Sequence, residues 1–391
     1  MYSDDRSPQI PPAELSAQRK TSLHLLLEEA TRQLNVCNAC RYCEGFCAVF
    51  PALAGRRLLN SGDISQLANL CHDCRACFDA CMYAPPHEFG INVPKVLSAV
   101  RAADYRRYVW PATVPRLLTG RTGLFSGAVI AGVLVVFIAM AHAGAGGLVA
   151  ADGEAASPYR LIPYPVMLVM LLVPAAFAMA VTAVAARRYW TQTGSGAAPD
   201  QAVRKAAAAW RAVRDAATLR YLRGGGGDCY YPQDDRPSPS RRRLHALVAY
   251  GFGLCAVSTV AAGVLQDIAR QPPPYLWLSV PVISGTAGGA SLIAGCTGLL
   301  ALKARSSPDT SFARMTVKDY GLLTALTWLA LTGLATLLTR STAAFGIVFL
   351  IHLSSVMLAF ATAPYSKLMH AVLRFLALLR DSMEREARRS A

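Results

Sequence analysis

Six apolar stretches after Arg121 restrict the possible folds of this chain more than any other feature. Each stretch approaches or exceeds the roughly 20 residues that a helix needs to cross a bilayer. Because backbone polar groups must be hydrogen-bonded internally in lipid, each stretch is expected to be a helix. Only 16% of the 391 residues are charged and 53% are hydrophobic, which excludes a disordered chain. The expected spans lie near 122–146, 162–185, 244–266, 278–302, 319–339 and 344–364.

The basic residues indicate how the six spans are oriented. Segments 1–121, 186–243, 303–318 and 365–391 carry 36 of the 39 lysines and arginines. The alternating segments carry only three basic residues, which are Arg160, Arg270 and Arg340. Since basic loops stay on the cytoplasmic side, both termini and the loop 186–243 are expected in the cytoplasm. This asymmetry explains the net charge of +15, so membrane lipid is an expected partner and nucleic acid is not.

Eight of the eleven cysteines form two runs with the spacing C-x2-C-x2-C-x3-C. Three thiolates at two-residue gaps can hold three corners of a 4Fe-4S cluster, and the fourth cysteine commonly binds the other cluster. Structural zinc usually takes two pairs of ligands, and disulfides are disfavoured in the cytoplasm. The sequence therefore predicts two clusters, one on Cys37, Cys40, Cys43 and Cys81 and the other on Cys71, Cys74, Cys77 and Cys47.

The surroundings of the cysteine runs predict helices. LHLLLEEATRQLNV leads into the first run and DISQLANL into the second, while the period-two pattern of strands is missing. We therefore expect an all-α protein, with an α-helical ferredoxin-like cytoplasmic domain over 1–121 and a six-span heme b domain over 122–391. No hydride-transfer site, nucleotide-binding loop or acid–base pair is visible, so no catalytic residue is predicted on this chain.

Four histidines in the membrane half are candidate heme ligands, since such groups are rarely placed in a bilayer without a function. His352 and His370 are eighteen residues apart, so on one continuous helix they would share a face about 27 Å apart. His245 opens the third span on the side where His370 lies, and this pair is the main predicted heme b site. A second heme on His352 and His142 stays open, as does a purely structural role in hydrogen bonding between helices.

Basic residues next to these histidines have two interpretations. Arg241 to Arg243 precede His245, and Lys367 and Arg374 flank His370. They could contact heme propionates or a quinone head group, or they could be juxtamembrane topology charges. The glycines of the fourth span likewise allow either close helix packing or room for a flat prosthetic group. The loop Gly224–Pro232 could dock a partner or act as a flexible linker.

The cysteine runs, APPHEFGINVP, GGGGDCYYP and HLSSVMLAFATAPYSKLMHAVLRF together resemble the tricarballylate utilization protein B family, also called CitB-like, over residues from about 30 to 380. The histidine spacing near the C-terminus also resembles the gamma-type cytochrome b subunit of respiratory nitrate reductases, although Cys255 departs from its two-heme pattern. The eight cysteines, His245, His352 and His370 stand at matching motif positions.

The resemblance implies a subunit of the bacterial inner (plasma) membrane that reoxidises an FAD-dependent dehydrogenase, namely tricarballylate dehydrogenase. Electrons would pass through the 4Fe-4S clusters and heme b to quinone. An alternative is an electron-transfer component of an oxygen-dependent enzyme in corrin (cobalamin) biosynthesis. A third interpretation, a metal-sensing membrane signalling protein, predicts no heme and no quinone reduction.

Overall fold

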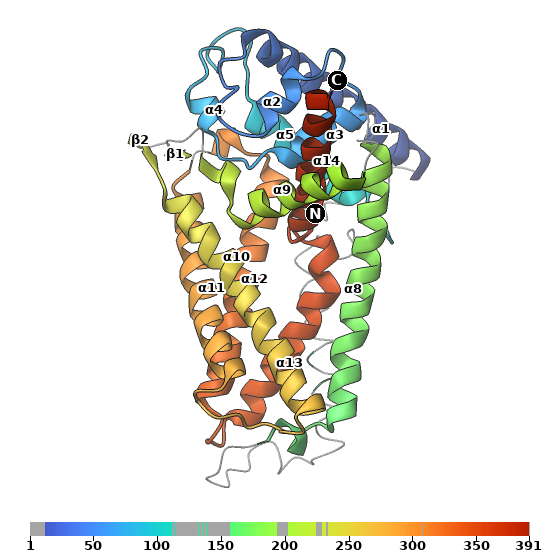
Figure 1. Cartoon of the computed structure of the whole chain (residues 1–391). Helices are drawn as coiled ribbons and strands as arrows, with labels where there is room; N and C mark the ends of the chain where they lie inside the picture. The colour runs from blue at the N-terminus through green and yellow to red at the C-terminus, as the bar shows by residue number, and fades with distance from the viewer. Residues whose placement is uncertain are drawn as a thin grey trace, which may run out of the picture.

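The computed structural model describes residues 12–111, 113, 132, 135, 138, 157–193, 202–223, 229–231, 234–306 and 308–390. Helices dominate these residues, so the predicted all-α class is confirmed. Figure 1 shows a layer of helices stacked on one end of a bundle of long helices. The one addition to the prediction is a small antiparallel pair, β1 (Cys229–Tyr231) and β2 (Asp234–Ser238), beside the junction of the two parts.

Five helices of the bundle are long and apolar enough to cross a membrane, which indicates a membrane protein. They cover the second to sixth predicted stretches. The first stretch, 122–146, lies outside the described residues except for three positions, so its helix stays a prediction. The five are α8 (Tyr164–Gln192), α10 (Ser240–Gly263, extended by a π-helical turn Val264–Ile268), α11 (Val280–Ala304), α12 (Ala313–Leu338) and α13 (Phe345–Thr362, extended by a 3-10 turn Ala363–Tyr365).

The expected continuous helix carrying both His352 and His370 is wrong. The α13 helix ends at Thr362, and α14 (Met369–Ser390) begins only after the 3-10 turn and an extended residue, Ser366. Pro364 lies in this break and explains it, because proline has no backbone N–H to donate and its ring clashes with the preceding helical turn. The two histidines therefore belong to separate helices, and the five-turn relation between them does not apply.

The N-terminal layer consists of five helices around a common apolar core. They are α1 (Pro12–Cys40), α2 (Val49–Ala54), α3 (Ser61–Leu70), α4 (Ala76–Asp79) and α5 (Val93–Arg107). A capping box begins α3: Asn60 Oδ1 accepts from the Asp63 N–H at 2.9 Å, and Asp63 Oδ2 accepts from the Asn60 N–H at 3.1 Å. Leu34, Leu67 and Leu97 are fully buried, so α1, α3 and α5 meet in this core.

The C-terminal helix α14 completes the core of the N-terminal layer. Leu373 and Ala377 are fully buried in it. Beyond them, the buried guanidinium of Arg56 lies 2.9 Å from Asp63 and 2.9 Å from Glu384 of α14. A breach of this buried ion network would leave uncompensated charges, so it binds the chain's last helix firmly to its first part. A further helix, α9 (Ala202–Ala217), lies beside α14.

All described contacts between the layer and the bundle lie at one end of the long helices. Arg188 of α8 donates to the Tyr108 carbonyl at 3.2 Å, and Arg75 donates to Ser311, just before α12, at 2.8 Å. The segment after α13 and the start of α10 reach the same end (Figure 1). Short 3-10 turns complete the described connections at Pro158–Arg160, Arg220–Arg223 and Pro308–Thr310.

Small residues between α10 and α11 serve close helix packing. A Cβ added at Gly288 would lie 2.7 Å from the Gly251 carbonyl and 2.8 Å from Cys255 Sγ. A Cβ at Gly295 would lie 2.8 Å from the Leu244 carbonyl. At these glycines the neighbouring helix fills the space, so they leave no room for a flat prosthetic group.

A buried carboxyl in the N-terminal layer makes stability depend on pH. Burial raises the pKa of Asp104 to about 7, although Ser65 donates to it at 2.7 Å and Asn69 at 3.0 Å. Its pKa in the unfolded chain is about 3.9, so its contribution to stability is full below that pH and is lost as the pH rises to about 7.

Asp104→Asn is therefore expected to stabilise the protein at pH 8, by up to about 4 kcal/mol, because the amide keeps an acceptor oxygen and carries no charge. The gain should shrink towards zero near pH 4. Thermal unfolding midpoints of the purified wild type and variant across this range measure the difference. A difference in unfolding midpoint that does not change with pH would contradict the raised pKa of Asp104.

Candidate functional site

The first cysteine run lies where a helix ends. Cys37 and Cys40 occupy the last turn of α1, and Arg41 adopts a left-handed conformation with φ 57°. The Arg41 N–H donates to the Cys37 carbonyl at 2.9 Å, which closes the helix. The chain then turns back, and this reversal places Cys43 beside the first two cysteines.

The second run follows a helix instead of ending one. Cys71 caps the C-terminus of α3, and two left-handed residues, Asp73 (φ 54°) and Arg75 (φ 68°), coil the chain before α4. Apart from Arg41, Asp73 and Arg75, only two non-glycine positions in the described residues have a positive φ, and both lie outside the cysteine runs. Strained backbone of this kind is retained where a site constrains the chain, which supports a functional role for both runs.

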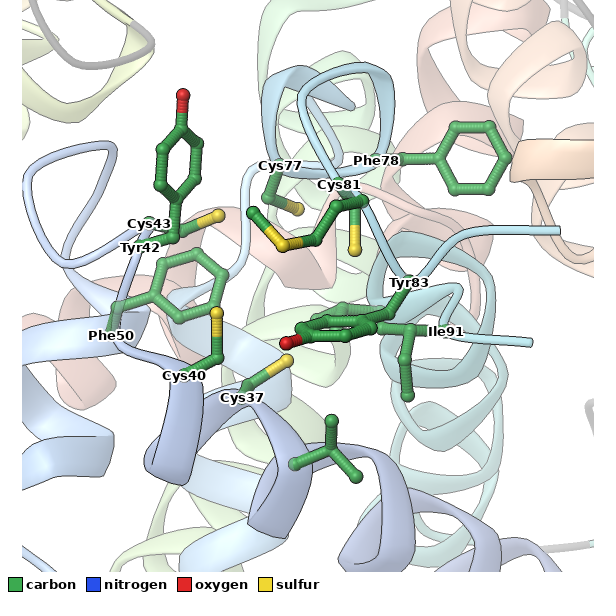
Figure 2. A pocket seen from close by; sticks show the side chains of 13 residues that line it. Cys37, Cys40, Tyr42, Cys43, Phe50, Cys77, Phe78, Cys81, Tyr83 and Ile91 are labelled. Atoms are coloured by element: carbon green, nitrogen blue, oxygen red, sulfur yellow. The ribbon is translucent and has the colours of Figure 1, made fainter. Parts of the chain in front are cut away.

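The structure gathers the cysteines around two hollows. The sulfurs turn towards a common space in the first hollow, beside Phe50 and Tyr83 (Figure 2). The first hollow is lined by Cys37, Cys40, Cys43, Cys77 and Cys81, and the second by Cys47, Cys71, Cys74 and Cys77. The fourth cysteine of each run thus lies with the first three of the other run, as the crossed assignment expects, and Cys77 lines both hollows.

The thiols lie in surroundings that favour their neutral form. Burial, together with the neighbouring Cys81, raises the pKa of Cys37 to about 12 and that of Cys43 to about 11. Burial also raises the pKa of Cys47 and Cys77 well above the ordinary value. Several thiolates in one dry hollow require a cationic group among them, which an iron–sulfur cluster provides. In the described residues no three Cys, His, Asp or Glu side chains are placed to hold a single metal ion.

Two arginines from the bundle end hold the loop that carries Cys71 and Cys74. Arg374 of α14 donates to the Asn69 carbonyl at 3.3 Å and also to the Cys71 carbonyl. Arg241 of α10 donates to the Asp73 carbonyl at 2.5 Å and to the His72 carbonyl at 3.1 Å. These arginines were expected at propionates, a quinone or the membrane surface, and the structure instead places them on the second cysteine run. We call the loop 69–73 with these two arginines the arginine clamp.

Sequence reasoning missed a third arginine on the same loop. Arg101 of α5 is 3% exposed and donates to the Cys71 carbonyl. The sequence carried a signal for it: Arg101 and Asp104 interrupt an otherwise apolar helical stripe that includes Leu97 and Tyr108. A charge at a core position of a helix requires a partner, which here is the cluster-bearing loop.

His72 acts within the clamp. Its Nδ1 lies 2.8 Å from an Arg374 nitrogen, and burial together with that guanidinium lowers the pKa of His72 well below its ordinary value. The ring is therefore neutral and accepts a hydrogen bond from the arginine. It supports the loop through its contact with Arg374.

His245 and His370 come together from α10 and α14. Their ring centroids are 6.3 Å apart with an angle of 85° between the planes. His370 Nδ1 lies 2.7 Å from the Lys367 carbonyl, so this nitrogen carries the proton and Nε2 is left as a ligand. His245 Nδ1 is buried and has no hydrogen-bond partner within the described part of the chain. An orphaned ring nitrogen beside a second histidine is the arrangement expected of a site for a further group.

Of the other two candidate histidines, the structure describes only His352. His352 Nδ1 lies 3.0 Å from Thr332 Oγ1 of α12, and its ring packs over Gly333. His142 lies outside the described residues. His352 thus makes the hydrogen bond between helices that the structural interpretation expects.

Lys367 is engaged by a buried carboxylate. Asp319 of α12 is 6% exposed and forms ion pairs with both Lys303 of α11 and Lys367. The pairs join α11, α12 and the link between α13 and α14 close to His370. This lysine therefore positions the helix end beside the histidine pair.

The comparisons with known proteins agree with this geometry. The family model for citrate utilization protein B matches residues 123–391, and the model for the citrate utilization protein B Fer4-like domain matches residues 30–107. The chain is 38% identical over 364 residues to citrate utilization protein B of Escherichia coli, covering 93% of this chain and 94% of that protein. No solved structure matches the chain. The cysteine hollows thus lie in a Fer4-like domain, which indicates an iron–sulfur electron-transfer protein, and the chain belongs to the citrate utilization protein B family.

Proposed function

We propose that this chain is the membrane electron-transfer subunit of a tricarboxylate-oxidising system. It takes electrons from an FAD-dependent dehydrogenase, tricarballylate dehydrogenase by resemblance, and delivers them to quinone. The observation that carries this proposal is the order of the sites. From the exposed surface of the N-terminal layer towards the bundle come the first hollow, the second hollow, the arginine clamp and the histidine pair.

The exposure of the two hollows supports this direction. Cys40 is exposed at the first hollow, where Tyr42 and Met82 are 59% and 62% exposed. Cys71 and Cys74, at the second hollow, are only 7% and 8% exposed, and their loop contacts α10 and α14. A donor protein can therefore reach the first hollow, while the second faces the membrane helices.

The residues of the chain hold, space and tune carriers in this scheme. Cys37, Cys40, Cys43 and Cys81 would hold one 4Fe-4S cluster, and Cys71, Cys74, Cys77 and Cys47 the other. Such clusters and heme b accept one electron at a time, which lets a two-electron flavin be reoxidised in steps. The backbone N–H of Asp73 donates to Cys71 Sγ at 3.4 Å, and hydrogen bonds to cluster sulfurs raise the reduction potential.

His245 and His370 would hold one heme b between α10 and α14, since their ring centroids lie 6.3 Å apart and the buried Nδ1 of His245 has no hydrogen-bond partner among the described residues. A heme b held there would accept and pass on one electron at a time. His352 and His142 remain candidates for a second heme.

The arrangement of the chain supports a cytoplasmic site for electron uptake in the bacterial inner membrane. The described parts of the basic segments 186–243, 303–318 and 365–391 lie at the bundle end that carries the N-terminal layer. By the positive-inside rule this end faces the cytoplasm, where a soluble flavoprotein can dock. We propose a membrane domain over 122–391, with α14 packed into the cytoplasmic domain over 1–121.

Reconstitution tests the relay. The purified protein in nanodiscs containing quinone is mixed with photoreduced FMN, and heme reduction and quinol formation are followed by absorbance. Cys74→Ala should slow heme reduction by at least about tenfold, while dithionite still reduces the heme. Cys296→Ala, at a buried cysteine of α11, is the matched control. Quinol formation at the wild-type rate without the second cluster would overturn the relay.

The arginine clamp predicts a measurable effect on reduction potential. Arg374→Gln removes a positive charge beside the second hollow, so the potential of its cluster should fall by on the order of 50 mV. Arg389→Gln, exposed on the last turn of the same helix, should leave the potential unchanged. A redox titration followed by electron paramagnetic resonance measures both variants. Equal potentials in Arg374→Gln and wild type would contradict a tuning role.

The family favours carboxylate utilization over the corrin alternative. The matching family models and the relative in Escherichia coli are all named for citrate utilization. Citrate and tricarballylate are both tricarboxylates, so the oxidised substrate belongs to this class on either name. We place the oxidation of this substrate on the partner dehydrogenase, with the present chain as its electron acceptor.

A further inference from the structure

We propose that α9, which lies outside all predicted spans, is an interfacial helix that rests in the surface of a bilayer containing anionic lipids. Figure 1 shows α9 running across the bundle, at the level where the N-terminal layer meets the long helices. The helix thus lies crosswise to α8 and α10, as a helix in the plane of a membrane surface does.

The two faces of α9 differ in what they contact. Ala208, Ala212 and Asp215 are buried on the side of α14, with 0%, 1% and 6% exposure. The opposite face carries Trp210, 68% exposed, and Val213, 44% exposed. Exposed Ala206 and Ala217 extend this face, since positions 206, 210, 213 and 217 lie on one side of a helix. We call these four residues the Trp210 stripe.

The end of α9 meets the lipid-facing surface of a span. Tyr250 of α10 is 55% exposed, and its hydroxyl donates to the Ala217 carbonyl at the C-terminus of α9. Leu247 and Leu254, one turn to either side of Tyr250, are also exposed on α10. The Trp210 stripe is thus continuous with the exposed apolar surface of α10.

The length of α10 sets the depth of this contact. Its 29 residues, Ser240–Ile268, extend about 43 Å, whereas the hydrocarbon core is about 30 Å thick. The excess belongs at the basic end, near Arg241, which places Tyr250 close to the boundary between head groups and hydrocarbon. Tyrosine and tryptophan are enriched at this depth.

The charges around the Trp210 stripe fit an anionic surface. Lys205 and Arg214 are exposed on α9, and Arg220 and Arg223 are exposed just after it. Each basic side chain near an anionic leaflet contributes about 1 kcal/mol to binding. Asp215, the acidic residue of α9, lies on the buried side and pairs with Arg220 at 3.3 Å.

An interfacial α9 would support α14 from the membrane side. Arg211 of α9 lies 2.6 Å from Glu386 of α14, and Arg385 of α14 donates to the Tyr221 hydroxyl at 3.0 Å. Thus α14, which carries His370 and Arg374, packs against α9. On its other face α9 would contact lipid. This arrangement fixes the height of the second cysteine run above the membrane.

Fluorescence quenching tests the depth of Trp210. The full-length protein and its Trp210→Phe variant are reconstituted in anionic vesicles with lipids brominated either near the head group or near the chain end. The difference in emission between the two proteins reports Trp210 alone. Shallow bromine should quench this signal at least about twofold more than deep bromine, and aqueous iodide should quench it weakly. Trp328→Phe supplies the reference, since Trp328 lies in the middle of α12 and should respond most to deep bromine.

Strong quenching of Trp210 by iodide, with none by brominated lipid, would overturn the proposal. Protection from iodide that arises only when a protein partner is added would instead assign the stripe to protein docking and overturn it as well. A Trp328 signal that responds to deep bromine in the same samples shows that the bundle is inserted, so these outcomes refer to α9 itself.

Discussion

Cys74→Ala is expected to remove one of the two clusters, leaving about four acid-labile sulfides and about five irons per chain, of which one belongs to the heme. Cys74 is 8% exposed at the second hollow, where no water can replace a lost thiolate effectively. Cys40→Ala should remove the other cluster, because Cys40 lines only the first hollow. Iron and sulfide analysis of anaerobically purified protein measures both losses. Cys255→Ala, at a thiol packed against Gly288 in the bundle, should retain the full content.

Double variants decide which cluster is bound by the last cysteine of each run, Cys47 or Cys81. If Cys47 belongs with the second run, Cys47→Ala combined with Cys74→Ala should lose no more iron than either change alone. Cys47→Ala combined with Cys40→Ala should then lose both clusters and nearly all iron. The reverse pattern would show that each run holds its own cluster, contrary to the two hollows in the structure.

His245→Ala and His370→Ala are each expected to abolish the b-type heme spectrum, since each removes one of two axial ligands. The dithionite-reduced minus oxidised spectrum of the purified protein, together with iron analysis, separates heme loss from cluster loss. The iron–sulfur content should remain at the wild-type level in both variants, because neither histidine lines a cysteine hollow.

Two further histidines serve as controls for heme binding. His24→Ala changes a side chain that is 73% exposed on α1 and should have no effect. His352→Ala should retain the heme held by His245 and His370, because the structure engages His352 with Thr332. Loss of half of the heme in His352→Ala would reveal a second heme, and an unchanged heme spectrum in His370→Ala would refute the main site.

The local spacing of the cysteines made the candidate site predictable from sequence. Both runs lie within short stretches whose helix ends and turns are decided by neighbouring residues, so three of the four thiols in each run had to come together. The crossed position of Cys47 and Cys81 followed from the same pattern and agrees with the two hollows. The pair His245 and His370 was suggested by depth alone, and the structure brings these rings together.

The contacts between distant segments could not be predicted in the same way. The five-turn relation of His352 and His370 failed because it treated the last span, near 344–364, and its extension as one helix, although Pro364 was a visible break signal. The arginine clamp joins residues more than 160 positions apart in sequence, and no periodicity encodes such a pairing. The sequence singled out Arg241 and Arg374 as candidate functional residues. The loop that each of them contacts became visible only in three dimensions.

The position of α14 in the N-terminal core has a consequence for biosynthesis. The ribosome makes the cysteine runs before the membrane helices, whereas Leu373, Ala377 and Glu384, which complete the core around the runs, are translated after those helices. Contacts with such a large sequence separation form only after the intervening helices have been inserted. The core of the N-terminal layer therefore stays incomplete until α14 has been made. Stable incorporation of the clusters is expected only after that point, and a truncation before Met369 should leave a protein that is inserted but cannot retain its clusters.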